Sequence, residues 1–449
     1  RHANRRDSLW ARMGRAPLAE SIGHLSLIAE RSTQLPSGAT PEAIATSYKE
    51  GLWEIDAAAG AALAAVHTKA DTDAVSEALK ACYVPWLEQT ASRFQDVVRK
   101  QGGLNPSMPG NTSLEQGLCT VFVDGLRYDV AVDLSKRLEA LGSVSVDTQW
   151  TSLPSVTSSG KAWVSPIAHK ITGQPTDVEF QPGVTDSGKP LSNYHFRKVL
   201  DDEGIQFLTF NETGQPSGRA WTECGDLDHF GHEHPLRLAR ELPNQMAQIV
   251  ERIQELSEAG WRHFRIVTDH GWLLVPGGLP KAELPKSQAE TRWGRCAVLK
   301  ETSTASMLTF GWDWCRQVQI AFAPGISSFV AGSEYAHGGL SLQECLVPVI
   351  TLAIGGGASA AVSVETTKLA WRGMRCQVEI TPAVPGLSVD IRSNAAAANS
   401  SVLTAAKPLT DGKASLAVPD DALEGNAAVV VILDATGKVI QKANTTIGE

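Results

Sequence analysis

Two short runs of β-branched and aromatic residues, each ending on an acidic side chain, constrain the fold of this chain most. The run TVFVD ends at Asp124, and the run FRIVTDH ends at Asp269 and His270. An amphipathic segment follows the first run, and the amphipathic segment LPNQMAQIVERIQELSEAG precedes the second. Strands that alternate with helices predict an α/β sheet with much parallel pairing and with helices on both faces. In such sheets the chemistry gathers beyond the carboxyl ends of the strands.

The segments on either side of this region have different patterns. Residues 1–113 are predicted to form a helical domain, because the stretch Thr40–Lys100 is rich in Ala, Glu and Lys and carries apolar residues at helical spacing. Residues 114–355 hold the alternating strands and helices, with CLVPVITLAI as a further buried strand. After the connector GGGASAA, residues 360–449 alternate short strands with turns, which is typical of an immunoglobulin-like β-sandwich.

Composition limits the setting in which the chain works. No run of about eighteen apolar residues is present, so we expect no contact with a membrane interior. Seven scattered cysteines without CxxC spacing favour a reducing, cytoplasmic compartment. The net charge of −9 argues against a protein that coats nucleic acid, but it does not exclude a nuclease with metal ions. The chain opens with RHANRRD, without an initiator Met or a signal segment, and we expect it to be the carboxyl-terminal part of a longer protein or a trimmed form of one.

Further carboxylate and imidazole groups gather in the stretch GDLDHFGHEHP. Asp228 and His232 stand four residues apart there, close enough to reach one ion. Taken alone, this stretch is equally compatible with a metal site and with a solvated acidic loop. His337 lies in the loop YAHGGLSLQE, and a single histidine in a loop is more often a surface residue than a ligand.

The stretch LPSVTSSGKAW supplies several hydroxyl groups, among them Ser155 and Thr157. A hydroxyl nucleophile needs activation by a base or a metal. Neither a GxSxG elbow nor a Walker-type loop is present, which leaves metal activation, with a Ser/Thr-rich turn as the plainer alternative. Lys161 is a candidate phosphate contact or else the first exposed residue of a helix.

In chain order, these residues resemble the ligand series of the alkaline phosphatase superfamily, most closely its phosphodiesterase and phosphonate-hydrolase branches. Those enzymes combine an Asp at a strand end with Pro-x-x-Thr, Asp-x-x-Gly-His, Asp-His-Gly and a late His. The corresponding residues here are Asp124, Thr157, Asp228, His232, Asp269, His270 and His337. The stretches VFVDGLRYD, LPSVTSSGKAW and TDHGW are also similar to the PglZ family, whose members belong to BREX-type bacterial defence systems against phage.

The resemblance covers roughly residues 115–355 and implies an alkaline-phosphatase-like catalytic domain with two divalent metal ions. One ion would be held by Asp124, Thr157, Asp269 and His270, and the other by Asp228, His232 and His337. Carboxylate and imidazole ligands suit zinc, and the oxygen-rich set would also accept manganese. Two ions roughly 4 Å apart can stabilise both the attacking and the leaving oxygen at phosphorus. Thr157 would then be the nucleophile.

The implied activity is that of a phosphodiesterase or nuclease acting on nucleic acid or a nucleotide, together with other BREX defence proteins. A monophosphatase remains an alternative, and so does a scaffold or regulatory component with a structural metal centre. The basic segment PKAELPKSQAETRWGRCAVLK, which contains Arg295 and Trp293, could track a phosphate backbone and stack on a base. A flexible solvated loop explains that segment equally well.

Overall fold

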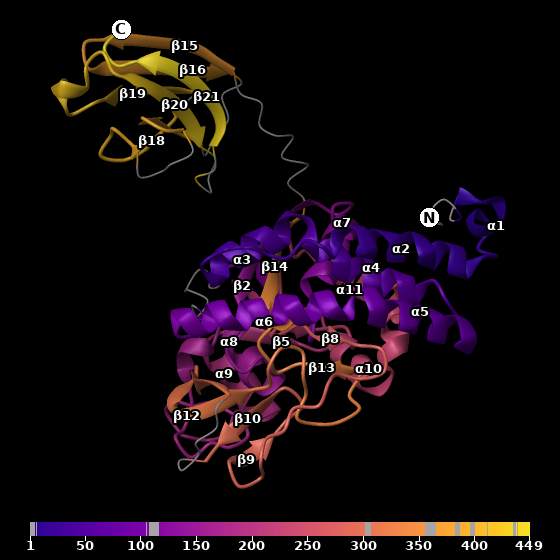
Figure 1. Ribbon diagram of the computed structural model, residues 1–449. Helices are drawn as coiled ribbons and strands as arrows, with labels where there is room; N and C mark the ends of the chain where they lie inside the picture. The colour runs from indigo at the N-terminus through magenta and orange to yellow at the C-terminus, as the bar shows by residue number, and fades with distance from the viewer. Residues whose placement is uncertain are drawn as a thin grey trace. The chain divides into compact units, whose positions relative to one another are not determined.

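The protein forms two compact units, Arg1–Gly355 and Gly356–Glu449 (Figure 1). The computed structural model describes residues 5, 7–104, 106, 116–300, 307–354, 365–381, 387–395, 400–410, 412–433, 437 and 439–449. The expected boundary at residues 113–114 and the connector GGGASAA lie outside the described residues. These domain limits therefore stay predictions.

A six-stranded mixed sheet lies at the centre of the first unit, with the order β2-β14-β7-β1-β6-β5. Its strands are β1 (Leu118–Phe122), β2 (Ser143–Trp150), β5 (Ile205–Leu208), β6 (Arg219–Glu223), β7 (His263–Val267) and β14 (Leu346–Ala353). Strands β5, β6, β1 and β7 are parallel, whereas β14 is antiparallel to both β7 and β2. Every residue of β1 is buried, as expected for a strand covered on both faces. The predicted α/β fold with substantial parallel pairing is confirmed.

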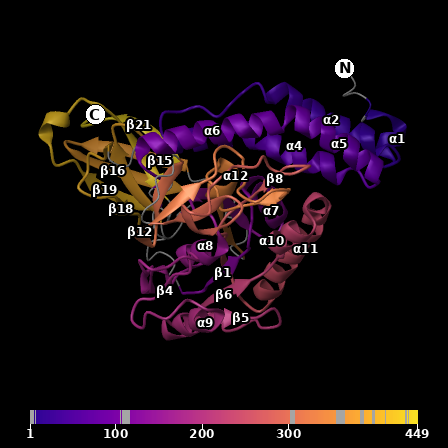
Figure 2. The same cartoon turned by 60° about the horizontal axis from the view of Figure 1, so that its bottom comes forward.

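Both faces of the sheet pack against helices. Successive side chains of a strand point to opposite faces, so neighbouring residues of β1 belong to different cores. Val121 of β1 joins a core that includes α7 (Tyr128–Leu138) and α11 (Pro235–Glu258). Its neighbour Phe122 joins a second core with α8 (Thr157–Val164) and α9 (Asn193–Asp202). Figure 2 labels these helices and α11 together with strands β1, β5 and β6. The sheet is thus enclosed between two layers of helices, as the sequence predicts.

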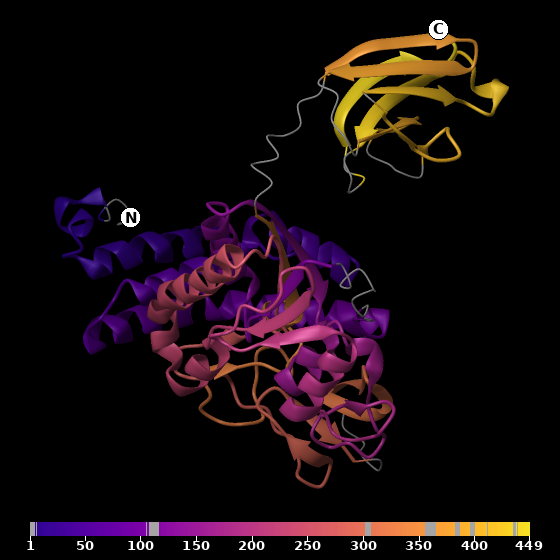
Figure 3. The same ribbon diagram turned by 180° about the vertical axis from the view of Figure 1, so that it is seen from behind.

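The amino-terminal segment is helical and shares one hydrophobic core with the sheet. Figure 3 shows these helices packed alongside one another in the first unit. Thr40 caps the third helix and Pro41 is its first residue, which is the arrangement that favours a helix start. The helices are α1 (Leu9–Arg12), α2 (Pro17–Arg31), α3 (Pro41–Ser47), α4 (Trp53–Ala64), α5 (Lys69–Cys82) and α6 (Val84–Gln101), with a π-helical turn at Tyr48–Leu52 between α3 and α4.

Shorter elements complete the first unit. A four-stranded antiparallel sheet has the order β11-β12-β10-β9, and two-residue strands pair as β13-β8 and β3-β4. Their bounds, with the two short helices, are β3 (Ile171–Thr172), β4 (Gly183–Val184), α10 (Leu227–Glu233), β8 (Leu273–Leu274), β9 (Ala289–Arg292), β10 (Cys296–Leu299), β11 (Leu308–Trp312), β12 (Cys315–Phe322), β13 (Tyr335–Ala336) and α12 (Leu342–Cys345).

The second unit is a β-sandwich, which confirms the predicted alternation of strands and turns. One sheet has the order β15-β16-β19 and the other β18-β17-β20-β21, with one buried core that draws on both sheets. The strands are β15 (Glu365–Arg372), β16 (Arg375–Thr381), β17 (Ser388–Arg392), β18 (Lys407–Pro408), β19 (Lys413–Ala417), β20 (Ala427–Leu433) and β21 (Val439–Thr446). Among the described residues of both units, no helix has the length and apolar character of a membrane span.

Candidate active site

The carboxyl ends of two neighbouring strands form the first part of the site. Strands β1 and β7 are parallel, with Phe122 opposite Val267, so the residues that follow them leave the sheet at the same edge. Asp124 Oδ1 lies 3.5 Å from His270 Nε2, and Asp269 Oδ2 lies 3.7 Å from the same nitrogen. These three side chains offer ligand atoms within 4.8 Å of one another, a geometry that can hold a metal ion.

Thr157 of α8 completes this first group. It is the first residue of α8, and its Oγ1 lies 3.1 Å from His270 Nε2 and 3.4 Å from Asp124 Oδ1. The indole nitrogens of Trp312 and Trp314 donate to Ser159 Oγ and to the Ser159 carbonyl, both at 3.0 Å, and thereby anchor the helix. The Thr157 hydroxyl is half-buried and faces the strand-end residues.

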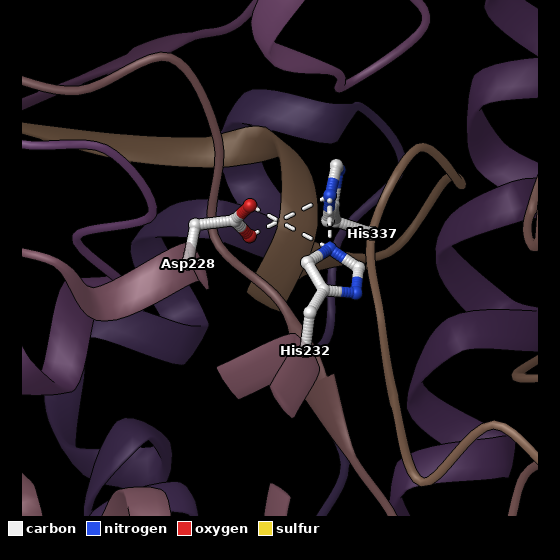
Figure 4. A group of neighbouring side chains, drawn as sticks. All are labelled: Asp228, His232 and His337. Carbon is white, nitrogen blue, oxygen red and sulfur yellow. Dashed lines mark hydrogen bonds and ion pairs between the residues drawn. The ribbon is translucent and has the colours of Figure 1, made fainter. Parts of the chain in front are cut away.

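Three further side chains converge as a second group (Figure 4). The stretch that contains Asp228 and His232 is a helix, α10, rather than a loop, so that residues four apart share one face. Asp228 Oδ2 lies 3.5 Å from His232 Nε2, and Asp228 Oδ1 lies 3.5 Å from His337 Nε2. The two Nε2 atoms are 3.0 Å apart.

The two groups are adjacent, because the rings of His270 and His337 stack with centroids 3.9 Å apart and planes inclined by 6°. The structure therefore brings all seven residues of the predicted ligand series into one cluster. Strand ends, helix starts and a loop each contribute, although the residues span positions 124 to 337 of the chain. Their roles as ligands stay predictions.

Backbone carbonyl groups fix the orientation of two of the imidazole rings. His270 Nδ1 lies 3.0 Å from the Gly271 carbonyl, and His337 Nδ1 lies 3.1 Å from the Ser155 carbonyl. A carbonyl oxygen only accepts, so Nδ1 of each ring carries a proton, and Nε2 is the nitrogen that would face a cation once the ring is neutral. Histidines that bind metals are commonly held in this way.

The hydrogen bonding of the Asp269 carboxylate indicates that the first group suits a cation. Oδ1 of this fully buried carboxylate accepts from the backbone amide of His270 at 3.0 Å. Oδ2 is buried and has no hydrogen-bond partner among the described residues. An unsatisfied buried carboxylate oxygen is costly, and a divalent cation bound between the three carboxylate and imidazole groups would satisfy it. The residues of the site therefore fit a metal.

Burial and mutual interaction shift the ionisation of the first group. Burial, with the neighbouring Asp269 carboxylate, raises the pKa of Asp124 well above its usual range. Burial on its own would lower the pKa of His270, but the surrounding carboxylates, Asp269 first, raise it to about 9. The negative charge of the neighbouring carboxylates contributes to both shifts, and a bound divalent cation would compensate this charge.

The second group shows the opposite balance, because imidazoles outnumber carboxylates in it. Burial would raise the pKa of Asp228, but three nearby histidines, His337 first, lower it below its usual range. Burial and the neighbouring His270 lower the pKa of His337 to about 3. An anionic carboxylate beside neutral imidazole is the ionisation state that metal binding requires.

Similarity to known proteins agrees with the motifs. No family model matches the chain. An alkaline phosphatase-like protein, BrxZ of Escherichia coli O9:H4 (strain HS), is 22% identical over 313 residues, which cover 61% of this chain and 34% of that protein. The chain resembles an alkaline phosphatase-like protein, as its sequence predicts. It spans about a third of the length of this relative.

Among solved structures, two similar chains are the ectonucleotide pyrophosphatase/phosphodiesterase 5 of mouse and of human. They are 10% and 13% identical, cover 53% and 54% of this chain and 88% of their own, and have a TM-score of 0.35 each. Similarity at this level does not bear on function.

Tyr335 is a site residue that the sequence did not reveal. Its hydroxyl donates to Asp228 Oδ1 at 2.9 Å. A Cβ atom at position 231 would lie 2.4 Å from the Tyr335 ring, so the glycine of the Asp-x-x-Gly-His motif gives this ring its place beside α10. The only available signal was its position two residues before His337 in YAH.

Lys161, the predicted phosphate contact, has another partner in the structure. Its Nζ forms an ion pair with Glu223 Oε1 at 2.7 Å and lies 5.3 Å from the ring centroids of both Phe122 and Phe196. Lys161 is on the same helix as Thr157, one turn further along. Contact with a phosphate would require it to leave Glu223 or to bridge the two, and this role stays a prediction.

The basic segment after Asp-His-Gly is an exposed loop in its first part and is built into the fold in its second part. It contains strands β9 and β10, and Arg295 is fully buried in an ion pair of 2.8 Å with Glu344. Trp293 packs against Phe180 with ring centroids 4.7 Å apart. Arg295 is therefore not available as a nucleic-acid contact, whereas that role for the half-buried Trp293 stays a prediction.

Proposed function

We propose that this chain is a metal-dependent phosphoesterase that cleaves phosphodiesters with Thr157 as its nucleophile. The observation that carries the proposal is the pair of adjacent ligand groups, the first of which faces the Thr157 hydroxyl and contains a buried Asp269 oxygen without a hydrogen-bond partner among the described residues. The similarity to an alkaline phosphatase-like protein supports the reaction class.

The residues divide between two divalent cations, zinc or manganese. Asp124, Asp269 and His270, with Thr157, would hold one, and Asp228, His232 and His337 would hold the other. Bound cations would lower the pKa of the Thr157 hydroxyl and offset the negative charge of the phosphate.

The reaction follows from the position of Thr157 at the start of α8. After its proton has passed to solvent, the Thr157 oxygen attacks phosphorus, a P–O bond to Thr157 forms, and the bond to the leaving alcohol breaks. The alcohol takes up a proton from water. A water molecule then attacks the phosphothreonine, which releases the phosphate product and restores the hydroxyl. The partial positive charge at the amino end of α8 favours the anionic oxygen during the first step.

The substrate class and the setting rest on resemblance. The Asp-x-x-Gly-His spacing in α10 supports diesters over monoesters, and the similarity to BrxZ supports work beside other BREX defence proteins in the cytoplasm, on nucleic acid or a nucleotide. A scaffold with a structural metal centre is the alternative, but a scaffold has no need of a hydroxyl at residue 157.

Hydrolysis of bis-p-nitrophenyl phosphate and p-nitrophenyl phosphate tests the proposal. Metal-stripped protein would be compared with protein given zinc or manganese, and with the Thr157→Ala variant. We expect metal-dependent cleavage of the diester, reduced by roughly 10³-fold or more in Thr157→Ala. Ser158→Ala, which alters an exposed hydroxyl on the same helix, is the matched control and should keep full activity.

Either of two results would contradict the proposal. Equal turnover by Thr157→Ala and the unaltered protein would remove Thr157 from the reaction. Tight metal binding without turnover of either ester would favour the scaffold.

A further inference from the structure

The helical amino-terminal segment reaches the loop that carries His337 through one buried side chain. Gln95 of α6 is 4% exposed. Its Nε2 donates to the Leu340 carbonyl at 3.0 Å and to the Gly325 carbonyl at 3.0 Å, and its Oε1 accepts from the Gly325 amide at 2.9 Å. The contact joins parts of the chain 245 residues apart, and Leu340 lies only three residues after His337.

Glu344 stabilises the loop, residues 337–344, to which Gln95 is hydrogen-bonded. This fully buried carboxylate accepts from the Gly339 amide at 2.8 Å and from the Ser341 hydroxyl at 2.7 Å. Arg295 donates to both of its oxygens, at 3.1 and 2.8 Å. Because every partner here is buried and hydrogen-bonded, the segment has one well-defined arrangement.

The same loop determines how the His337 ring is aimed. The Ser155 hydroxyl donates to the Gly339 carbonyl at 2.9 Å, and the Ser155 carbonyl accepts from His337 Nδ1 at 3.1 Å. Ser155 precedes Thr157 by two residues. A displacement of the loop at Leu340 would therefore move His337 relative to Thr157 and to Asp228.

A second helix holds the far end of the loop. Asp56 of α4 is fully buried, and it accepts from Gln343 Nε2 at 2.9 Å. The hydroxyls of Tyr48 and Tyr83 donate to the same carboxylate at 2.7 and 2.6 Å. The loop is thus held from two helices of the amino-terminal segment, at Leu340 and at Gln343.

We propose that Gln95 and Asp56 are positioning residues for the second ligand group, so that the amino-terminal helices set the place of His337. The inference rests on the proposed metal-dependent function. The first group depends on the loop less directly, because Asp124, Asp269 and His270 follow from strands β1 and β7, although the Gly271 amide donates to the Glu344 carbonyl at 3.0 Å. Loss of the helical contacts should therefore weaken the second metal site more than the first.

The test compares Gln95→Ala with Gln89→Ala, which alters an exposed glutamine on the same helix. Gln95→Met is the second variant, because it fills the space without the hydrogen bonds should the alanine protein fail to fold. The first measurement is hydrogen exchange of peptides that span residues 337–344 in metal-free protein. We expect the Gln95 variants to exchange faster there and Gln89→Ala to match the unaltered chain.

The second measurement is a competitive zinc titration against a chromophoric chelator. We expect two sites in the unaltered protein, one of which weakens by about 10–100-fold in Gln95→Met. The His337→Ala variant identifies the weakened site, because it removes a ligand of the same group. A merely structural role would lower thermal stability without selecting one site.

The outcomes separate the two proposals. If the unaltered chain binds zinc at two sites and Gln95→Met binds at both with the same affinity, the positioning role is wrong although the proposed function stands. Equal weakening of both sites, or unchanged exchange at residues 337–344, also overturns the positioning role. If the unaltered chain binds no zinc or manganese, the proposed function fails, and the positioning of a metal ligand fails with it.

Discussion

Tyr335 is not one of the candidate metal ligands, but it contacts two residues of the second group. Its hydroxyl holds Asp228 Oδ1, and its ring lies edge-on to His232 with centroids 4.9 Å apart. Burial and the nearby Asp228 raise the pKa of Tyr335 well above its usual range, so that the phenol stays protonated and remains a donor. The hydroxyl therefore helps to orient the carboxylate so that Oδ1 faces His337 and Oδ2 faces His232.

We predict that Tyr335→Phe weakens metal binding at the second group by about 10–100-fold, because Asp228 loses the hydrogen bond that orients it. The phenylalanine ring keeps the packing against Gly231, so the fold should be retained. Competitive zinc titration measures the effect, with Tyr194→Phe, which alters a tyrosine that is 71% exposed, as the control. Unchanged affinity would show that α10 alone orients Asp228.

The positions of the strand-end carboxylates could be predicted from the sequence, whereas the contact of Tyr335 could not. Asp124 and Asp269 each follow an apolar run, and parallel strands place such residues at one edge of a sheet. The bond from Tyr335 to Asp228 spans 107 residues. No local pattern records a contact between a single tyrosine and a distant helix, so only the tertiary structure could reveal it.

The hairpin of β11 and β12 supports the turn that leads to Thr157. Asp313 lies in the hairpin turn and accepts from the Leu153 amide at 2.6 Å, and its own amide donates to the Leu153 carbonyl at 3.4 Å. Arg316 Nη2 lies 2.8 Å from the Asp313 carboxylate, whose side chain is only 1% exposed. Burial raises the pKa of Asp313 to about 6, although the Leu153 amide and Arg316 oppose this.

This raised pKa predicts a pH-dependent contribution of Asp313 to stability. The folded chain favours the protonated carboxyl, so the contribution is fully present below the unfolded pKa of about 3.9 and is lost as pH rises through about 6. Between these values, the free energy of unfolding of the unaltered protein should fall by roughly 2–3 kcal/mol relative to Asp313→Asn. Urea unfolding of both proteins at a series of pH values measures this difference. A difference that does not vary with pH would contradict the prediction.

Elements whose charges are buried were the hardest to interpret from the sequence. Arg295 stands in a basic stretch, but its partner Glu344 lies 49 residues away, and together they are buried beside the His337 loop. Charge density alone suggests a solvated surface, since buried arginines are rare unless paired. The sequence around Asp228 was equally compatible with a metal site and a solvated loop. In the structure it is the helix α10, which packs against Tyr335.

The two units have separate hydrophobic cores, and every predicted site residue belongs to the first. The order of strands and helices and the β-sandwich could be predicted, because hydrophobic periodicity is a local property. The packing of the amino-terminal helices into the same core as the sheet could not be predicted, because it depends on long-range contacts such as the hydrogen bond from Gln95 to Leu340. Metal binding should accordingly act on the stability of the first unit as a whole.

We predict that zinc or manganese raises the thermal stability of the first unit and leaves that of the second unchanged. A ligand that binds only the folded state adds about 2.7 kcal/mol when its concentration is 100 times the dissociation constant. Calorimetry of the full chain with and without a chelator measures the shift, and hydrogen exchange of peptides from each unit assigns it. In Asp269→Ala the metal-dependent rise should shrink, because the variant lacks the buried carboxylate whose Oδ2 has no partner among the described residues. An equal rise in both units would mean that the metal acts outside the Asp124–His337 cluster.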